Sequence, residues 1–267
     1  MKVDDAPMTR RRRGAVLACR VDAVTADEAL VRVASWAEAR ESRYVCACNV
    51  HAVVTAWRDP SFRRVVDGAD LALPDGAPVA WLLRRLGFED QRRVCGPDFM
   101  WEFCRLAERR GIAVCLVGST EAVLERLAAR LRAAFPALRL AGAWSPPFRP
   151  LTAAEEAELV AQIDRSGAGV AFVGLGCPKQ ERWIASLRGR VRAAMIGVGA
   201  AFEFHAGTRA RAPAWMQRLG LEWLHRLASE PRRLWRRYLV TNALFVAGAA
   251  AQLVRDARRA RGSDAPR

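Results

Sequence analysis

Several short motifs that would assign a chain to a known kind of site are missing from these 267 residues. The seven cysteines form no CxxC pair and only three histidines accompany them, so no spacing typical of a zinc site occurs and we expect no bound metal. No Gly-Lys-Ser/Thr triplet follows a glycine-rich turn, which excludes the common P-loop. No Asp-x-Asp pair occurs, although such a pair often holds a divalent cation against a diphosphate.

Signals for export are missing as well. The N-terminus, MKVDDAPMTRRRR, is followed by only a short apolar stretch and then acidic residues, which does not match a signal peptide. Most cysteines stand in apolar runs such as VCAC at 45–48 and AVCLVG at 113–118, where a thiol behaves as a small buried hydrophobe. We therefore expect a reducing, cytoplasmic compartment and a basic, disordered leader at 1–14.

What the chain has in excess is positive charge. The formal net charge is +15, and from position 205 to the end 13 arginines face four acidic residues. Such a segment attracts phosphates, whether in nucleic acid, in anionic lipid headgroups or in a diphosphate-linked substrate. Composition leaves these three partners open, but a hydrophobic content of 52% excludes a disordered chain.

Short apolar runs alternate with helical patterns every 20 to 30 residues or so. Thr25 with Glu28, and Thr152 with Glu155, form capping boxes that open two of the helices. This alternation predicts a Rossmann-like, doubly wound α/β fold with a mostly parallel sheet over 15–205. The expected strands cover 44–48, 69–73, 112–117, 138–141, 170–175 and 193–198, after one or two short strands at 15–24.

The most informative stretch is VAFVGLGCPKQERWI at 170–184, which predicts a buried strand, a tight turn and a helix. Gly174 and Gly176 allow the backbone to turn sharply and to approach a ligand. The free N–H groups of the helix start, with Lys179 beside them, suit an anion, and Gln180 suits a hydroxyl or an amide. An ordinary strand-to-helix turn predicts the same pattern, so this stretch alone leaves both interpretations open.

Polar residues follow two other expected strands. Asn49 comes after the strand at 44–48, and Asp75 lies in the Pro-Asp-Gly turn after 69–73. Each is a common turn residue, but ligands of open α/β sheets bind beyond the carboxyl ends of the strands. Arg93, before the helix that starts near Asp98, is by itself an ordinary surface charge.

From Gly207 onward arginine and tryptophan are interleaved with leucine, and this predicts a helical appendage over 206–267. Pro213 and Pro231 are expected to start separate short helices. The stretch at 238–254 is mostly apolar, and its 17 residues are near the lower limit for a membrane span. We favour an amphipathic helix in the membrane interface over a membrane span. The third alternative, a helix packed on the core, explains the leucines but not the density of tryptophan and arginine.

Four motifs occur together in one order: ADLALPDG at 69–76, RVCGPD at 93–98, GLGCPKQE at 174–181 and RAPAWMQRLGLEWLHRLASEPRR at 211–233. In order and spacing the chain resembles the WecG/TagA/CpsF glycosyltransferases from about Val16 to Tyr238. The resemblance implies an inverting, metal-independent enzyme without a cofactor. Such an enzyme moves a hexose, often N-acetylated, from a UDP-sugar to a polyprenyl-diphosphate-linked sugar in surface polysaccharide synthesis.

The resemblance also implies roles for single residues. Asp75 corresponds to the proposed catalytic base of the family, and Arg93 to a contact of the nucleotide diphosphate. Asn49 and Gln180 would then orient the sugar, with Lys179 beside them. Family members usually have Thr-x-Asn before the second helix, whereas Ala47 replaces the threonine here, so the donor preference is expected to differ.

The appendage has an implied role too. Arg211, Arg226 and Arg233 are expected to hold the acceptor diphosphate at the cytoplasmic face of the membrane, to which the protein would bind peripherally. The rival interpretation is a non-enzymatic, nucleic-acid-binding α/β protein. It explains the arginines but assigns no function to the PDG and GLGCPKQE turns. We expect no nucleic-acid partner, and the sequence leaves a homo-oligomer open.

Overall fold

The computed structural model describes residues 10–263, and one parallel sheet of six strands organises them. The strands follow the order β4-β3-β8-β7-β5-β6, so the chain crosses over between distant positions of the sheet. Their bounds are β3 Arg43–Ala47, β4 Leu71–Leu73, β5 Val114–Gly118, β6 Leu140–Trp144, β7 Val170–Gly174 and β8 Ala194–Gly197. The predicted doubly wound α/β fold is confirmed, and Trp144, which was expected in a loop, ends β6.

Both faces of the sheet are buried, because successive side chains of each strand point to opposite sides. Phe172 belongs to the core on one face and Val173 to the core on the other. The first face is covered by α1 (Ala26–Glu38), α5 (Gly96–Arg110), α6 (Glu121–Ala134) and α9 (Ala201–Ala206). The second is covered by α2 (Val50–Arg58), α3 (Pro60–Asp67), α4 (Ala77–Arg85), α7 (Ala153–Arg165) and α8 (Lys179–Ser186).

The first strand begins at Arg13, two residues before the expected boundary at residue 15. Strands β1 (Arg13–Val16) and β2 (Cys19–Asp22) form an antiparallel hairpin. The buried carboxylate of Asp22 accepts hydrogen bonds from the Arg11 guanidinium at 2.6 Å and from the backbone N–H of Ala72 at 2.7 Å. This ties the hairpin to β4, while residues 1–9 of the expected leader lie outside the described part of the chain.

Both predicted capping boxes are present at the starts of α1 and α7. In each, the threonine hydroxyl accepts from the backbone N–H three residues later, and the glutamate carboxylate accepts from the threonine N–H. These local hydrogen bonds fix where the helices begin.

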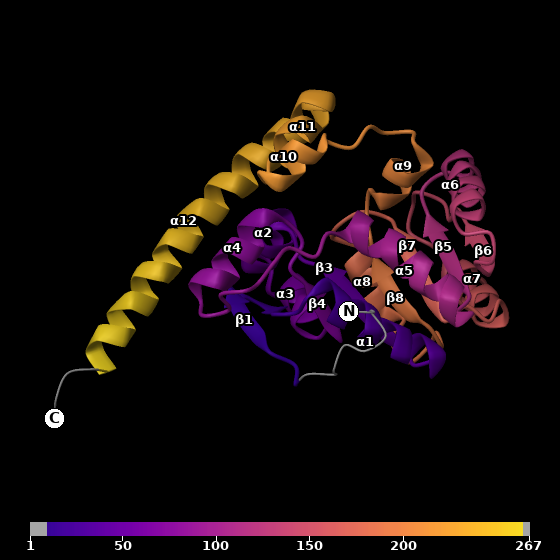
Figure 1. Cartoon of the computed structure of the whole chain (residues 1–267), viewed down its shortest axis with the longest axis horizontal. Coiled ribbons are helices and arrows are strands. Elements are labelled where there is room, and N and C mark those ends of the chain that lie inside the picture. Colours follow the sequence, from indigo (N-terminus) through magenta and orange to yellow (C-terminus); the bar gives the residue numbers. More distant parts are fainter. Residues whose placement is uncertain (1–9, 264–267) are drawn as a thin grey trace.

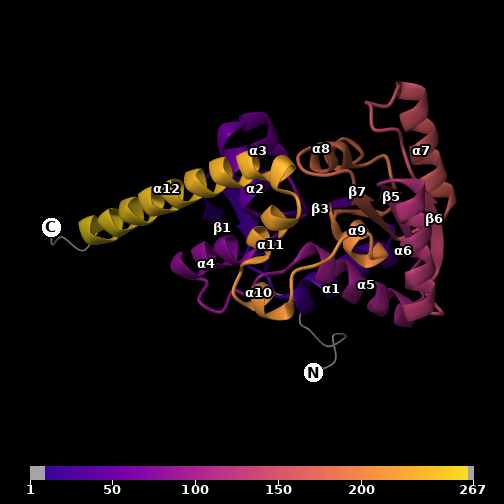
Figure 2. The same cartoon turned by 90° about the horizontal axis from the view of Figure 1, so that it is seen from above.

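The C-terminal region consists of α10 (Ala214–Arg218), α11 (Glu222–Ser229) and α12 (Pro231–Ser263). With 33 residues, α12 is much longer than the short helix expected after Pro231. Figures 1 and 2 show it running from α11 past α2 and away toward the C-terminus. Phe245 and Ala249 are buried in the core of the sheet's second face, and Gln252 hydrogen-bonds the backbone of Ala15 and Leu17.

The other side of α12 is exposed and apolar. Leu239 is 66% exposed and Val246 67%. Within the described residues the segment Pro231–Arg259 is long and apolar enough to cross a membrane, with a mean hydropathy of 1.2, but only by length and composition. One such helix is weak evidence for a span, and α12 is also partly packed on the core.

Candidate active site

The carboxyl ends of β3 and β4 lie side by side, because Ala47 and Leu73 are partners in the parallel register. The chain leaves β3 into Asn49, whose side-chain oxygen caps α2 by accepting the Ala52 N–H at 3.1 Å. It leaves β4 into Asp75, whose N–H bonds the Leu73 carbonyl at 2.9 Å. The sheet therefore brings the two predicted residues together, and the Asn49 side chain hydrogen-bonds the Asp75 carboxyl group.

Asp75 and Asn49 border a cavity of about 920 Å³ between this edge of the sheet and the C-terminal helices. Glu222 is the second acid in its lining, and Trp81 of α4 forms part of the wall. The cationic lining residues are Arg84, Arg93, Arg211, Arg218, Arg226 and Arg237. Six arginines against two acids make the polar end of this cavity a site for an anion.

Ion pairs hold two of these arginines in place. Arg93 pairs with Glu222, and the Nε of Arg211 lies 3.4 Å from the same carboxylate. Arg211 also pairs with Asp98 through both oxygens, its Nη2 donating at 2.9 Å. Because a paired guanidinium keeps further N–H donors, it can be held by protein and still bind an anion.

The environment changes the proton affinity of Asp75. Burial against the cavity wall raises its pKa from 3.8 to about 6, and the negative charge of Glu222 acts in the same direction. The hydrogen bond from Asn49 and the charges of Arg93 and Arg226 oppose this rise. A carboxyl group with this pKa is ionised at neutral pH and still basic enough to accept a proton in a reaction.

Three predicted residues do not line this cavity. Gln180 is 3% exposed, and its Oε1 accepts from the backbone N–H groups of Gly176 and Gly199 at 3.1 and 3.2 Å. Lys179 is exposed and donates to the Phe148 carbonyl at 3.3 Å. Arg233 pairs with the neighbouring Glu230 and also lies outside the lining.

Further residues line the cavity as well. His51, which the sequence places with Asn49 beyond the end of the strand at 44–48, lies in the first turn of α2. Burial together with the charge of Arg237 lowers the pKa of His51 to about 4, so its imidazole is neutral at pH 7. Glu222 was missing from the predicted set, although it is one of only two acids in the motif at 211–233, with Glu230. Arg237 lies outside all four motifs, so nothing singled it out.

A carboxyl group of raised pKa at the edge of a parallel sheet, faced by arginines, suits an enzyme that transfers a group from a diphosphate. The described residues contain no cluster of three or more His, Cys, Asp or Glu side chains that would hold a metal ion. The fold and this cavity thus define the class as an α/β group-transfer enzyme.

Comparison with known proteins makes the class more specific. The model of the "Glycosyl transferase WecG/TagA/CpsF family" matches residues 15–259, so the chain belongs to this family and is a glycosyltransferase. The predicted resemblance is confirmed, and with it the enzymatic interpretation over the nucleic-acid-binding one.

Two curated relatives carry the same name, N-acetylglucosaminyldiphosphoundecaprenol N-acetyl-beta-D-mannosaminyltransferase. The protein of Bacillus subtilis is 31% identical over 197 residues, covering 73% of this chain and 74% of the relative. That of Bacillus spizizenii is 28% identical over 206 residues, covering 77% and 78%. The similarity thus extends over most of each chain.

Proposed function

We propose that the enzyme transfers a hexose or N-acetylhexosamine from a UDP-sugar to a polyprenyl-diphosphate-linked sugar, with inversion and without a metal ion. The observation that carries this proposal is Asp75, a carboxylate with a raised pKa at the arginine-lined end of the cavity. The names of the relatives support the acceptor class, since both act on a sugar linked to undecaprenol through a diphosphate. N-acetylmannosamine is the matching candidate for the donated sugar.

In the proposed reaction Asp75 accepts the proton of the attacking acceptor hydroxyl. The hydroxyl oxygen forms a bond to the anomeric carbon while the bond from that carbon to the UDP oxygen breaks. UDP leaves with the electron pair, and its charge is met by Arg93 and Arg211. The sequence predicts Arg211 at the acceptor diphosphate, but we assign it to UDP because it shares the Glu222 carboxylate with Arg93. A single displacement from the face opposite the leaving group inverts the anomeric configuration. Asn49 holds the carboxylate and offers its amide to the sugar.

The acceptor diphosphate needs cations of its own. Arg226 lies over the ring of Phe204, 5.8 Å from its centroid, and Arg237 lies beside it in the cavity wall. We assign the acceptor diphosphate to these two arginines. Arg233 remains a candidate for a contact with anionic lipid, because its side chain is 59% exposed.

The exposed apolar side of α12 supports a position on the inner face of the cell membrane. Trp235 is 51% exposed, and Leu239, which is 66% exposed, extends the same exposed surface. Large exposed apolar surfaces of this kind mark membrane or protein contacts. We propose peripheral attachment, in which these side chains enter the headgroup region and nearby arginines contact anionic lipid.

The test is Asp75→Asn, assayed for transfer to a lipid-linked acceptor. Loss of a general base lowers the rate by roughly 10²- to 10⁴-fold, whereas UDP affinity measured by calorimetry should stay near the wild-type value. Asp90→Asn, at an exposed position outside the cavity, is the matched control and should transfer at the wild-type rate. An Asp75→Asn enzyme that retains more than a tenth of the turnover would rule out Asp75 as the base.

A further inference from the structure

The cavity at Asp75 does not end at the arginines but extends along α12. Beyond Asp75 one wall is α4, which contributes Ala77, Pro78 and Trp81. The facing wall is α12, which contributes Phe245, Val246, Ala249, Ala250 and Leu253. The lining thus changes from charged to apolar along a single cavity.

A second hollow of about 700 Å³ continues in the same direction. It shares Trp81 and Leu253 with the first cavity, and its other lining residues are the apolar Leu86 and Ala257 and, at its rim, the charged Arg85 and Asp256. Between Tyr238 and Ala257 an α-helix rises about 28 Å. We call these two connected hollows the α4–α12 groove.

We propose that the α4–α12 groove holds the isoprenoid chain of the lipid-linked acceptor next to its diphosphate. This inference rests on the proposed function and adds a binding site for the isoprenoid chain, which does not react. An anionic head followed directly by a hydrocarbon chain satisfies both the arginines near Asp75 and the apolar walls of α4 and α12. The small side chains of Ala249 and Ala250 leave room for such a chain along α12.

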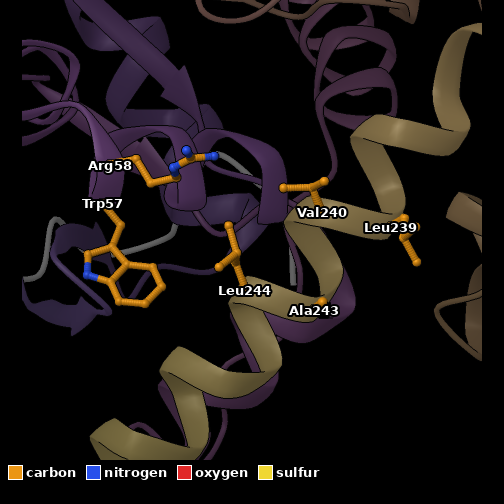
Figure 3. A pocket seen from close by; sticks show the side chains of 6 residues that line it. All are labelled: Trp57, Arg58, Leu239, Val240, Ala243 and Leu244. Atoms are coloured by element: carbon orange, nitrogen blue, oxygen red, sulfur yellow. The ribbon is translucent and has the colours of Figure 1, made fainter.

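The opposite flank of α12 lacks this continuity. Figure 3 shows a hollow there, with Trp57 and Arg58 of α2 facing Leu244 and Val240 of α12. Its volume is about 630 Å³, and none of its lining residues borders the cavity at Asp75. A chain bound on that flank would not lead to the base, so we assign the acceptor chain to the α4 flank.

The test compares two neighbouring alanines of α12. Ala250→Trp fills the groove, whereas Ala251→Trp adds the same side chain at an exposed position that lines none of the hollows described above. Farnesyl diphosphate and inorganic diphosphate serve as probes in calorimetry. The wild type should bind farnesyl diphosphate at least about tenfold more tightly, since each buried methylene group adds affinity. Ala250→Trp should lose this preference and Ala251→Trp should keep it.

Kinetics give the second readout. With the same sugar diphosphate on a long polyprenyl chain and on a short, water-soluble alkyl chain, Ala250→Trp should raise KM at least about tenfold for the long-chain acceptor only. The kcat with the short-chain acceptor and the affinity for UDP should not change. Val246→Gln provides a second variant, because this position lines the groove and is 67% exposed, so a polar side chain there does not endanger folding.

A vesicle flotation assay separates the acceptor chain from bilayer lipid as the occupant. Leu239→Glu, outside the groove, should weaken binding to anionic vesicles and keep the preference for farnesyl diphosphate. Ala250→Trp could instead fail to float with the vesicles and still bind farnesyl diphosphate more tightly than inorganic diphosphate. In that case the groove holds bilayer lipid and the proposal is wrong. Equal binding of the two diphosphates by the wild type also overturns it. If the wild type transfers no sugar at all, the proposed function fails, while the binding measurement still decides about the groove.

Discussion

The substitution Asp75→Asn should stabilise the folded protein while it removes activity. In the folded chain burial raises the pKa of Asp75 to about 6, compared with 3.8 as its ordinary value. The folded state therefore holds the Asp75 proton more tightly than the unfolded state, so the fold loses stability as the pH rises from about 3.8 to about 6, and the loss is complete above that. The difference between these two pKa values corresponds to up to about 3 kcal/mol at pH 7 and above, relative to a neutral side chain of the same shape.

The sign of this effect gives it a definite pH dependence. As the pH falls from about 6 toward 3.8, Asp75 takes up its proton in the folded state and the wild type regains the lost stability. The difference between Asp75→Asn and the wild type should therefore be largest above pH 6 and disappear near pH 4. For a chain of this size, the gain in Tm at pH 8 is expected to be roughly 5 °C or more.

The assay is thermal unfolding of both proteins in a pH series from 4 to 8. Asp90→Asn is again the control and should follow the wild-type curve, because the side chain is exposed outside the cavity. If Asp75→Asn unfolds at the wild-type temperature at pH 8, or if its gain is the same at every pH, then the pKa of Asp75 is not raised in the folded protein.

Two further predictions concern the charges around the base. Transfer should persist in EDTA, since Arg93 and Arg211 meet the leaving diphosphate; complete loss that Mn²⁺ restores would contradict the metal-independent reaction. Glu222→Gln should lower the pKa of Asp75 and move the acid limb of the kcat/KM profile to lower pH, because the Glu222 carboxylate is one of the charges that raise it. Asp98→Asn, which breaks the other ion pair of Arg211, should leave that limb in place, and an unmoved limb in Glu222→Gln would show that its charge does not act on Asp75.

The parts of the fold that local patterns determine were predictable from the sequence. The buried strands alternate with capped helices, and the capping boxes at Thr25 and Thr152 mark helix starts within a few residues. The juxtaposition of Asn49 and Asp75 was also predictable, because both follow strands and the carboxyl ends of parallel strands share one edge.

Other features depend on contacts between distant parts of the chain. Gln180 stands in the expected first turn of α8, but its amide turns inward to the backbone of Gly176 and Gly199. No sequence pattern indicates whether such an amide will bond a ligand or the protein's own backbone. The position of Glu222 beside Arg93 is of the same kind, since 129 residues separate the two in the sequence.

The two hydrogen bonds between Gln252 and the backbone of Ala15 and Leu17 affect the order in which parts of the protein can pack together during synthesis. The amide oxygen of Gln252 accepts from Leu17 at 2.8 Å, and its nitrogen donates to the Ala15 carbonyl at 2.6 Å, so the first hairpin meets the last helix. During synthesis the sheet is complete once β8 has left the ribosome, whereas the hairpin waits for residue 252. Because the same helix forms a wall of the cavity at Asp75, a nascent chain has the base but not the enclosure around it. The enclosure of the cavity therefore depends on a helix that follows the last strand of the sheet by more than 30 residues.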